Sequence, residues 1–403
     1  MFTKNESAIE WSGEIDQQRT RSFIPYGRHW VDEEDIAAVV EVLKSDWLTT
    51  GPIVEKFENA LAKFVGAKYG VSLSSGTAAL HAAMHAAGIS PGDEVIVPAM
   101  TFVATANAVV FEGGIPVFAD VDPNMLLIDP TKVEEKITSR TKAIVAVDYA
   151  GQPCHYDGLR EIADRHGLIL IADACHALGA EYKGRKVGTV ADLTVFSFHP
   201  VKSITTGEGG MVTTDDPNLA QRMRIFRNHG ITSDHRQRQA DNSWFYEMAE
   251  LGYNYRLTDI QCALGLSQLK KLPKWLVRRQ EIARQYDHAF SSLSEISPLE
   301  VRHEVSHAYH LYVVKLGIER LKGNRAQVFA SLRKEGIGVN VHYIPVHLHP
   351  FYRHRFGTKM GDCPFAENAY ERIISLPIFP LMSNNDVDHV ISALGKLMEV
   401  FGR

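Results

Sequence analysis

Short apolar runs separated by longer amphipathic stretches dominate the chain between about residues 69 and 214. Two of these runs, 95–97 and 169–172, contain no alternating polar positions. Strands of that kind are buried on both faces, as in parallel sheets. The expected strands lie at 69–73, 94–97, 116–119, 143–147, 169–172, 193–198 and 211–214.

Amphipathic stretches fill most of the gaps between these runs. Helices are expected at 77–87, 101–111, 131–137 and 159–166, and, ahead of the first strand, at 35–43 and 54–64. Strands that alternate with helices predict a mostly parallel sheet covered on both faces. The fold class expected for this part is therefore α/β, with a seven-stranded sheet.

The pattern changes after Leu257. One helical stretch runs to about residue 269, and Pro273 favours a break before a second helix that ends near residue 293. Further elements are a β run at 309–316, a helix at 325–334, a strand at 338–343 and a terminal helix at 386–401 with Ser383 as N-cap. We expect a polar extension at 1–22, a large domain at 23–272 and a smaller α+β domain at 273–403.

Composition and charge exclude several classes of protein. The net charge of −5 gives no general affinity for nucleic acid or anionic membranes, and no apolar run is long enough to cross a bilayer. The N-terminus lacks the apolar segment of a secretory signal. The widely spaced cysteines form no CxxC pair, so we expect neither a metal site nor disulfides, and a cytoplasmic location fits. These cysteines are Cys154, Cys175, Cys262 and Cys363.

Lys202 lies on a short connection between the apolar runs 193–198 and 211–214, just before a glycine-rich turn at 207–210. Partial desolvation reduces the preference of a lysine for its ammonium form. A neutral amine can attack a carbonyl to form a Schiff base, as pyridoxal phosphate chemistry requires. The alternative is a surface lysine in a turn.

Ser75, Gly76 and Thr77 follow the first strand and open a helix. Free backbone N–H groups at a helix start, together with two hydroxyl groups, can form a phosphate cradle, and glycine permits close backbone approach. The alternative is a strand-to-helix turn with a good N-cap. Ser197, five residues before Lys202, could also donate to a phosphate.

Asp173 follows the apolar run 169–172, at the strand end where parallel sheets bind ligands. A carboxylate there can pair with a protonated pyridine nitrogen, although it could instead cap a helix. Cys175 is interpreted as a small buried cysteine, and His176 as a packed or supporting residue of the same pocket.

Phe102 could stack on an aromatic cofactor ring, although a core phenylalanine is the ordinary interpretation. Asn254 and Arg256 form a second polar cluster just before a long apolar helix. They could face the same pocket, or belong to a loop at the helix start.

These motifs together resemble fold-type I pyridoxal-phosphate enzymes, specifically the nucleotide-sugar aminotransferases of the DegT/DnrJ/StrS group. The resemblance covers about residues 23–403 and keeps the order of the group's motifs. It rests on SGTA at 75–78, TFVATAN at 101–107, DACHALG at 173–179, SFHPVK at 197–202, GEGG at 207–210, GYNYRL at 252–257 and VHY at 341–343.

The resemblance implies pyridoxal 5'-phosphate as cofactor and Lys202 as its covalent attachment point and proton shuttle. Asp173 would pair with the pyridine nitrogen and Phe102 would stack on the ring, with His176 beside it. The remaining roles implied are phosphate binding by Gly76, Thr77 and Ser197, phosphate binding in the neighbouring subunit of a homodimer by Asn254, and substrate binding by Tyr26, Trp47, Leu48, Thr49, Ser75, His342 and Tyr343.

Within the group, the sequence is similar to transaminases of pseudaminic acid biosynthesis, through DYAG at 148–151, SFH at 197–199, ITT at 204–206 and ALGLSQLKK at 263–271. This likeness implies transfer of an amino group from glutamate to C4 of a UDP-linked 4-keto-6-deoxy-N-acetylhexose. Transaminases that make aminoarabinose for lipid A have similar motifs, so a UDP-4-ketopentose or a dTDP-ketosugar stays an alternative. Related sugar dehydratases carry histidine in place of the lysine, and Lys202 argues against that activity. The intact Lys202, Asp173 and phosphate loop argue against a non-catalytic regulator.

Overall fold

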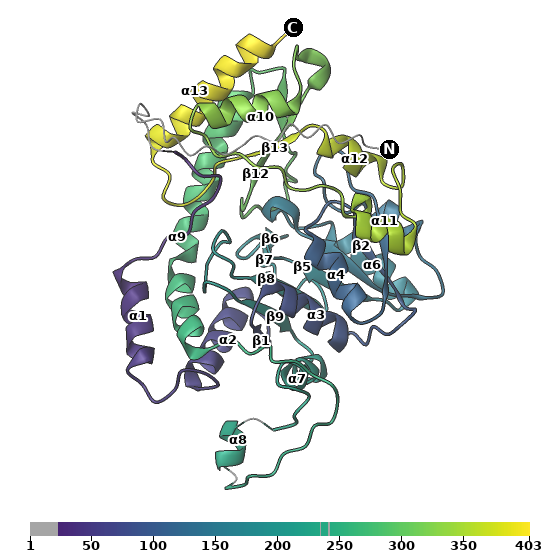
Figure 1. The fold of residues 1–403 in the computed structure, drawn as a ribbon, viewed down its shortest axis with the longest axis vertical. Helices are drawn as coiled ribbons and strands as arrows, with labels where there is room; N and C mark the ends of the chain where they lie inside the picture. The colour runs from purple at the N-terminus through teal and green to yellow at the C-terminus, as the bar shows by residue number, and fades with distance from the viewer. Residues whose placement is uncertain (1–22, 234, 241) are drawn as a thin grey trace.

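A seven-stranded sheet forms the centre of the larger part of the molecule (Figure 1). The computed structural model describes residues 23–403 except 234 and 241, so the expected extension at 1–22 lies outside the described residues. The sheet order is β1-β9-β8-β5-β4-β2-β3, and only β9 runs antiparallel to its neighbours. The strands are β1 Tyr69–Leu73, β2 Glu94–Pro98, β3 Ile115–Ala119, β4 Thr141–Val147, β5 Ile169–Asp173, β8 Leu193–Ser197 and β9 Gly210–Thr214.

Helices cover this sheet, and α3 among them is buried along nearly its whole length. Its alanine-rich sequence explains this burial, because small side chains let α4, α7, β8 and β9 approach closely. The helices of this part are α1 Glu33–Leu43, α2 Pro52–Val65, α3 Gly76–Ala86, α4 Val103–Phe111, α5 Pro130–Glu134, α6 Tyr156–His166, α7 Pro217–Phe226 and α8 His235–Ala240.

The helix α9, Asp259–Phe290, is continuous through Pro273, so the predicted break there is wrong. Proline removes one helical hydrogen bond and disfavours the helix interior by about 3 kcal/mol. Burial of Leu272 and Trp275 on either side of the proline offsets this cost. Tertiary packing therefore overrides a local stop signal.

Two hydrophobic cores meet along α9. The first core surrounds the large sheet and includes Trp275 of α9. The second core includes the residues of α9 from Ile282 onward that are buried. Val346 and Cys363, from beyond the predicted boundary at 272/273, also pack into the first core. That boundary stays a prediction, because α9 and the C-terminal segments contribute to both cores.

The C-terminal part contains an antiparallel sheet of order β10-β12-β13. Its terminal helix is capped at Ser383, whose hydroxyl accepts the N–H of Asp386, as expected. The elements are β10 Ile296–Pro298, β12 Tyr312–Leu316, α10 Arg325–Lys334, α11 Pro350–Phe356, α12 Pro364–Tyr370, β13 Ile373–Leu376 and α13 Asn384–Phe401. Short strands β6 Glu181–Tyr182, β7 Arg185–Lys186 and β11 Val305–Ser306 form a third sheet.

The strand predicted at 338–343 does not form. Within it only Asn340 pairs, in a single bridge with Ser375. The His342 imidazole is hydrogen-bonded to the Ser375 hydroxyl, and the Tyr343 hydroxyl is hydrogen-bonded to His176. Separate side-chain hydrogen bonds therefore fix this segment. These contacts stand in place of the regular strand pairing that was predicted for 338–343.

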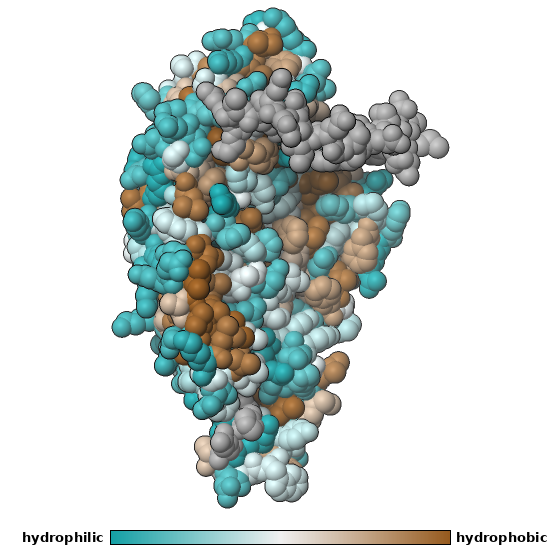
Figure 2. All heavy atoms as spheres, turned by 60° about the vertical axis from the view of Figure 1, so that its left-hand side comes forward, coloured by the Kyte–Doolittle hydropathy of each residue, from teal (hydrophilic) through white to brown (hydrophobic). Residues whose placement is uncertain are grey.

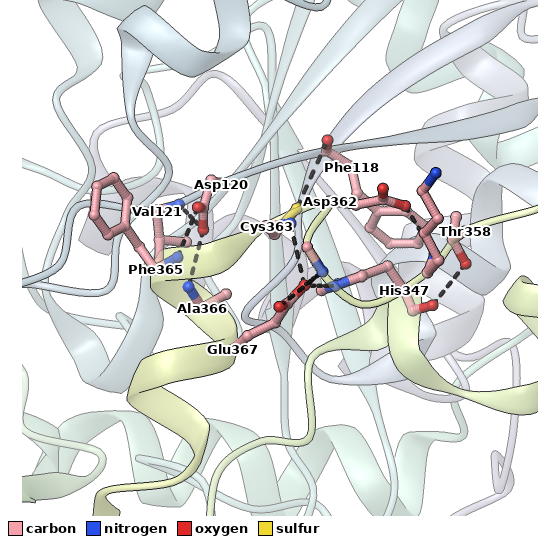
Figure 3. A network of polar contacts seen from close by, with 12 residues as sticks. Phe118, Asp120, Val121, His347, Thr358, Asp362, Cys363, Phe365, Ala366 and Glu367 are labelled. Atoms are coloured by element: carbon pink, nitrogen blue, oxygen red, sulfur yellow. Dashed lines mark hydrogen bonds and ion pairs between the residues drawn. The ribbon is translucent and has the colours of Figure 1, made fainter. Parts of the chain in front are cut away.

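The segment that follows Tyr343 is fixed to the large sheet by a polar network (Figure 3). The carboxylate of Asp120, just after β3, accepts the N–H groups of Phe365 and Ala366 at the start of α12, at 2.8 and 2.9 Å. Glu367 accepts a bond from His347 at 2.8 Å. These contacts hold His342 and Tyr343 near the carboxyl end of the sheet.

Candidate active site

The carboxyl ends of the parallel strands bring the predicted cofactor residues together. Asp173 ends β5, Ser197 ends β8, and β1 leads directly into the N-terminus of α3. In the sheet register Asp173 pairs with Val147 of β4 and Val195 of β8. Because parallel strands end at the same edge, these side chains surround one site.

The start of α3 has the features of a phosphate cradle. The Ser75 hydroxyl accepts the N–H of Ala78 at 3.1 Å, while the first N–H groups of a helix have no intrahelical acceptor. A Cβ atom added at Gly76 would lie 2.8 Å from the Cβ of Ser197, so glycine lets the helix begin against that serine. Gly76, Thr77 and Ser197 thus fit an anionic phosphate group.

The Asp173 carboxylate is buried, with an exposed fraction of 6%, and is oriented by two donors. The hydroxyl of Thr105 donates to its Oδ2 at 2.7 Å, and the N–H of Cys175 donates to its Oδ1 at 3.3 Å. Thr101 and Thr105 share a further hydrogen bond of 2.8 Å. A fixed, buried carboxylate of this kind fits a protonated pyridine nitrogen.

We expect Thr105→Val to lower kcat about tenfold, because a hydrogen bond to a charged group contributes about 1.5–3 kcal/mol. The measurement is kcat at saturating cofactor. Thr101→Val serves as control, since Thr101 contacts Thr105 and not the carboxylate, and its effect is expected to be smaller. An unchanged kcat in Thr105→Val would show that Asp173 needs no such support.

Lys202 follows β8 in a turn, where its N–H donates to the carbonyl of His199 at 2.9 Å. Burial lowers the pKa of its amine, while nearby Cys175 and Asp173 act in the opposite direction. A lowered pKa increases the share of neutral amine, the nucleophilic form. This position agrees with the desolvation expected for an attachment lysine.

Aromatic and imidazole groups form another wall of the site. The Tyr343 hydroxyl lies 3.2 Å from His176 Nε2, and its ring centroid is 5.9 Å from that of Phe102. Tyr26 and His342 have centroids 5.4 Å apart. Burial and the charge of Lys202 lower the pKa of His342 to about 4, so this wall is uncharged at neutral pH.

Two of these residues answer open questions from the sequence. Phe102 is 54% exposed and is therefore available for stacking. His176 is buried, and burial, followed by the charge of Lys202, holds its pKa well below the usual range. Its role in cofactor binding stays a prediction, but a neutral imidazole bonded to Tyr343 supports the interpretation of a packed, supporting residue.

Sequence reasoning missed His310, Tyr149 and Thr105. The rings of His310 and His176 have centroids 4.3 Å apart, and the Tyr149 hydroxyl donates to the carbonyl of His342. Thr105 lies inside the TFVATAN motif, but its bond to Asp173 depends on the spacing between α4 and β5. The sequence signals for these residues were the TFVATAN motif for Thr105, the DYAG motif at 148–151 for Tyr149, and the closely spaced aromatic and histidine residues at 307–310 for His310.

The predicted substrate residues Trp47, Leu48 and Thr49 lie apart from Lys202 and the aromatic and imidazole groups described above. Trp47 lines a cavity of about 840 Å³ together with Arg227 and Arg256, and Lys202 does not line it. Leu48 and Thr49 are exposed and pair with the start of α9, where the Leu48 carbonyl accepts the N–H of Asp259 at 3.1 Å.

Asn254 also lies apart from Lys202 and the aromatic and imidazole groups described above, and its side chain is exposed. Its neighbours Tyr253 and Tyr255 stack at 4.9 Å and both approach His81. In extended chain alternate side chains point to opposite sides, so Asn254 points away from α3. Arg256 donates to Asn228 at 2.9 Å.

No three side chains of histidine, cysteine, aspartate or glutamate gather to hold a metal ion in residues 23–403, with 234 and 241 left aside. In the same part of the chain, none of the helices combines the length and apolarity needed to cross a membrane.

With this fold and this arrangement of Lys202 and Asp173, the chain belongs to the DegT/DnrJ/EryC1/StrS aminotransferase family, whose sequence profile matches residues 30–395. It is a fold-type I aminotransferase that depends on pyridoxal phosphate, as the sequence predicted.

Individual relatives match over almost their whole length. The spore coat polysaccharide biosynthesis protein SpsC of Bacillus subtilis is 44% identical over 384 residues, which cover 95% of this chain and 99% of SpsC. The structure of Helicobacter pylori PseC, an aminotransferase of pseudaminic acid biosynthesis, superposes with a TM-score of 0.88 at 36% identity and covers 94% of this chain and 100% of PseC. The PLP form of Spr1654, a putative sugar aminotransferase of Streptococcus pneumoniae, has a TM-score of 0.88 at 34% identity, covering 94% and 99%.

Proposed function

We propose that this aminotransferase moves an amino group from L-glutamate to the C4 keto carbon of a UDP-linked 4-keto-6-deoxy-N-acetylhexose, in the cytoplasm, during surface-glycan biosynthesis. Glutamate leaves as 2-oxoglutarate and the ketosugar becomes an aminosugar. The observation that carries the proposal is the likeness to PseC, at 36% identity over 94% of the chain.

The site geometry is consistent with this reaction. Bound pyridoxal phosphate supplies an electron sink for the carbon that gains or loses the amine. Lys202 would move the proton at that carbon, and Asp173 would hold the proton of the ring nitrogen. The backbone of Gly76 and Thr77 would bind the phosphate. In this proposal neutral His342 and the rings of Tyr26 and Tyr343 would contact the uncharged sugar ring of the nucleotide-sugar.

A panel of ketosugars tests the choice of substrate. UDP- and dTDP-linked 4-ketosugars and a UDP-4-ketopentose are each incubated with the enzyme and ¹⁵N-glutamate, with product mass and stereochemistry as readouts. We expect the highest kcat/KM for the UDP-linked N-acetylhexose. Preference for the pentose or for dTDP-sugars would assign the protein to another branch of the family.

We further propose a homodimer in which Asn254 completes the cofactor site of the partner. Asn254 points outward from its own subunit, and exposed apolar surface supports subunit association. Figure 2 shows apolar atoms gathered on the side of α1 and α9, where Ile36 and Leu43 are exposed. The face of α1 that packs against α9 carries a polar residue, since buried Asp35 bonds to Gln268 and Lys271. Ile36 and Leu43 therefore lie on other faces of α1 and stay exposed.

Mixing Lys202→Ala with Asn254→Ala tests the shared site. If Asn254 serves the partner, both defects of a mixed dimer fall in one site and the other site is intact. Activity is then expected to recover to about half that of wild type per mixed dimer, on the assumption of independent sites. Verified mixed dimers without recovery would place Asn254 in the site of its own subunit.

A further inference from the structure

Two histidines one turn apart on α3, His81 and His85, converge on a single carboxylate. Glu112, the C-cap of α4, lies 3.0 Å from His81 Nε2 and 3.6 Å from His85 Nδ1. The other nitrogen of His85 reaches Glu250, at 3.3 Å. His85 thus lies between two carboxylates that come from different parts of the chain.

Glu250 belongs to the segment 228–256 between α7 and α9, called the arm here, which extends away from the sheet and carries α8 (Figure 1). At its base, Tyr253 N–H donates to Phe226 at 2.7 Å and Ala249 N–H donates to Gly230 at 2.9 Å. The arm exposes large apolar side chains, among them Trp244 at 86%.

The base of the arm is joined to α3 at further points. The Tyr255 hydroxyl lies 3.2 Å from His81 Nδ1, and its carbonyl accepts the N–H of Ser74 at 2.8 Å, directly before the phosphate cradle. Asn254 lies between two tyrosines that are held in this way. Any movement of the base relative to α3 therefore displaces Asn254.

We propose that His85 is a positioning residue: hydrogen-bonded to Glu250 and ion-paired with Glu112, it fastens the base of the arm to α3 and thereby sets where Asn254 is presented. This inference rests on the proposed role of Asn254 in the partner site. It adds to that role a group that does not touch cofactor or substrate.

The chemistry of imidazole makes this fastening depend on pH. Only protonated His85 can donate to both carboxylates at once, because a neutral ring carries a single N–H. Burial would lower the pKa of His85, but the bonds and charges of Glu112 and Glu250 outweigh it and raise that pKa. Burial alone would raise the pKa of Glu112. The hydrogen bonds and charges of His81 and His85 outweigh burial and lower that pKa to about 2.

The other groups around His85 come from α7 and the rest of α3. The Phe226 ring stacks on the imidazole at 4.0 Å, and the Arg222 guanidinium bonds to the His85 carbonyl at 2.9 Å. Because the pKa of folded His85 is raised above 6.5, its contribution is full below that pH and is lost as the pH rises through the folded value.

Hydrogen exchange of residues 243–256 in the holoenzyme tests the fastening. After correction for intrinsic rates, exchange in wild type is expected to rise about tenfold between pH 6 and pH 9, the factor for losing one bond to a charged group. His85→Gln should exchange fast at both pH values, whereas exposed His303→Gln should behave as wild type. A pH-independent wild type, or a His85→Gln variant identical to wild type, would overturn the proposal.

The link to Asn254 is tested by the rate of cofactor release at pH 6. As a single substitution, His85→Gln is expected to speed cofactor release severalfold. Added to Asn254→Ala, it is expected to have no further effect, because interacting positions are non-additive. Additive effects would show that His85 does not act through Asn254. Glu250→Gln, at a more exposed position, gives the same test if His85→Gln does not fold. The exchange result is independent of the mixed-dimer result, so failure of the shared site and failure of the fastening are distinguishable.

Discussion

Lys202→Ala is expected to fold normally and to lose turnover by on the order of 10⁴-fold or more. Two functions disappear together, covalent attachment of the cofactor and proton transfer at the reacting carbon. The neighbouring imidazoles are poor replacement bases, because burial holds the pKa of His176 and of His310 well below the usual range and lowers the pKa of His342 to about 4.

The measurement is kcat with glutamate and the preferred ketosugar, alongside circular dichroism to verify folding. Lys183→Ala is the matched control, since this exposed lysine pairs with Asp157 on the surface and should give wild-type rates. A Lys202→Ala protein that keeps more than a few per cent of wild-type activity would mean that another amine performs the chemistry.

Asp173→Ala is expected to reduce kcat by about 10²–10⁴-fold, as removal of one preorganised charge does in other active sites. In the proposed site the buried carboxylate would hold the proton of the ring nitrogen, so its loss would weaken the electron sink. Asp173→Asn separates charge from shape, because the amide retains the size and can still accept the Thr105 bond.

Both Asp173 variants are compared at saturating cofactor, so that weaker binding is not mistaken for slower chemistry. We expect Asp173→Asn to be nearly as slow as Asp173→Ala. Near-normal turnover in folded Asp173→Ala would show that a different acid serves the ring nitrogen.

The large sheet could be predicted because its strands carry their own signal. Strands β2 and β5 contain uninterrupted apolar runs in the sequence, and the observed strand β1 has the predicted bounds. The C-terminal part could be predicted less well. The strand expected at 338–343 is absent because contacts of His342 and Tyr343 with distant residues decide its course.

Proline signals were the other source of error. Pro273 predicted a helix break, yet α9 continues because Leu272 and Trp275 are buried in the first core. The Asp216–Pro217 pair does start a helix, α7, where the Asp216 side chain accepts the N–H of Asn218. The two sites differ locally, because Asp216 can cap a helix and Leu272 cannot, and the packing of Leu272 and Trp275 carries α9 through Pro273.

The residues proposed for the active site differ in how they can be found. Lys202, Asp173 and Gly76 lie in motifs next to strand ends, where the topology of a parallel sheet predicts ligand contact. His310 and Thr105 lie beside them only because separate elements pack together. Asn254 shows the opposite case, since its motif is visible in the sequence but its side chain is exposed at the surface of the chain.

The most direct test of the account is borohydride reduction of the purified holoenzyme followed by peptide mapping. The protein is expected to be yellow, to lose that absorbance on reduction, and to carry the reduced cofactor on the peptide that contains Lys202. A cofactor adduct on any other lysine, or bound cofactor that reduction fails to attach to the chain, would contradict the assignment of the active site.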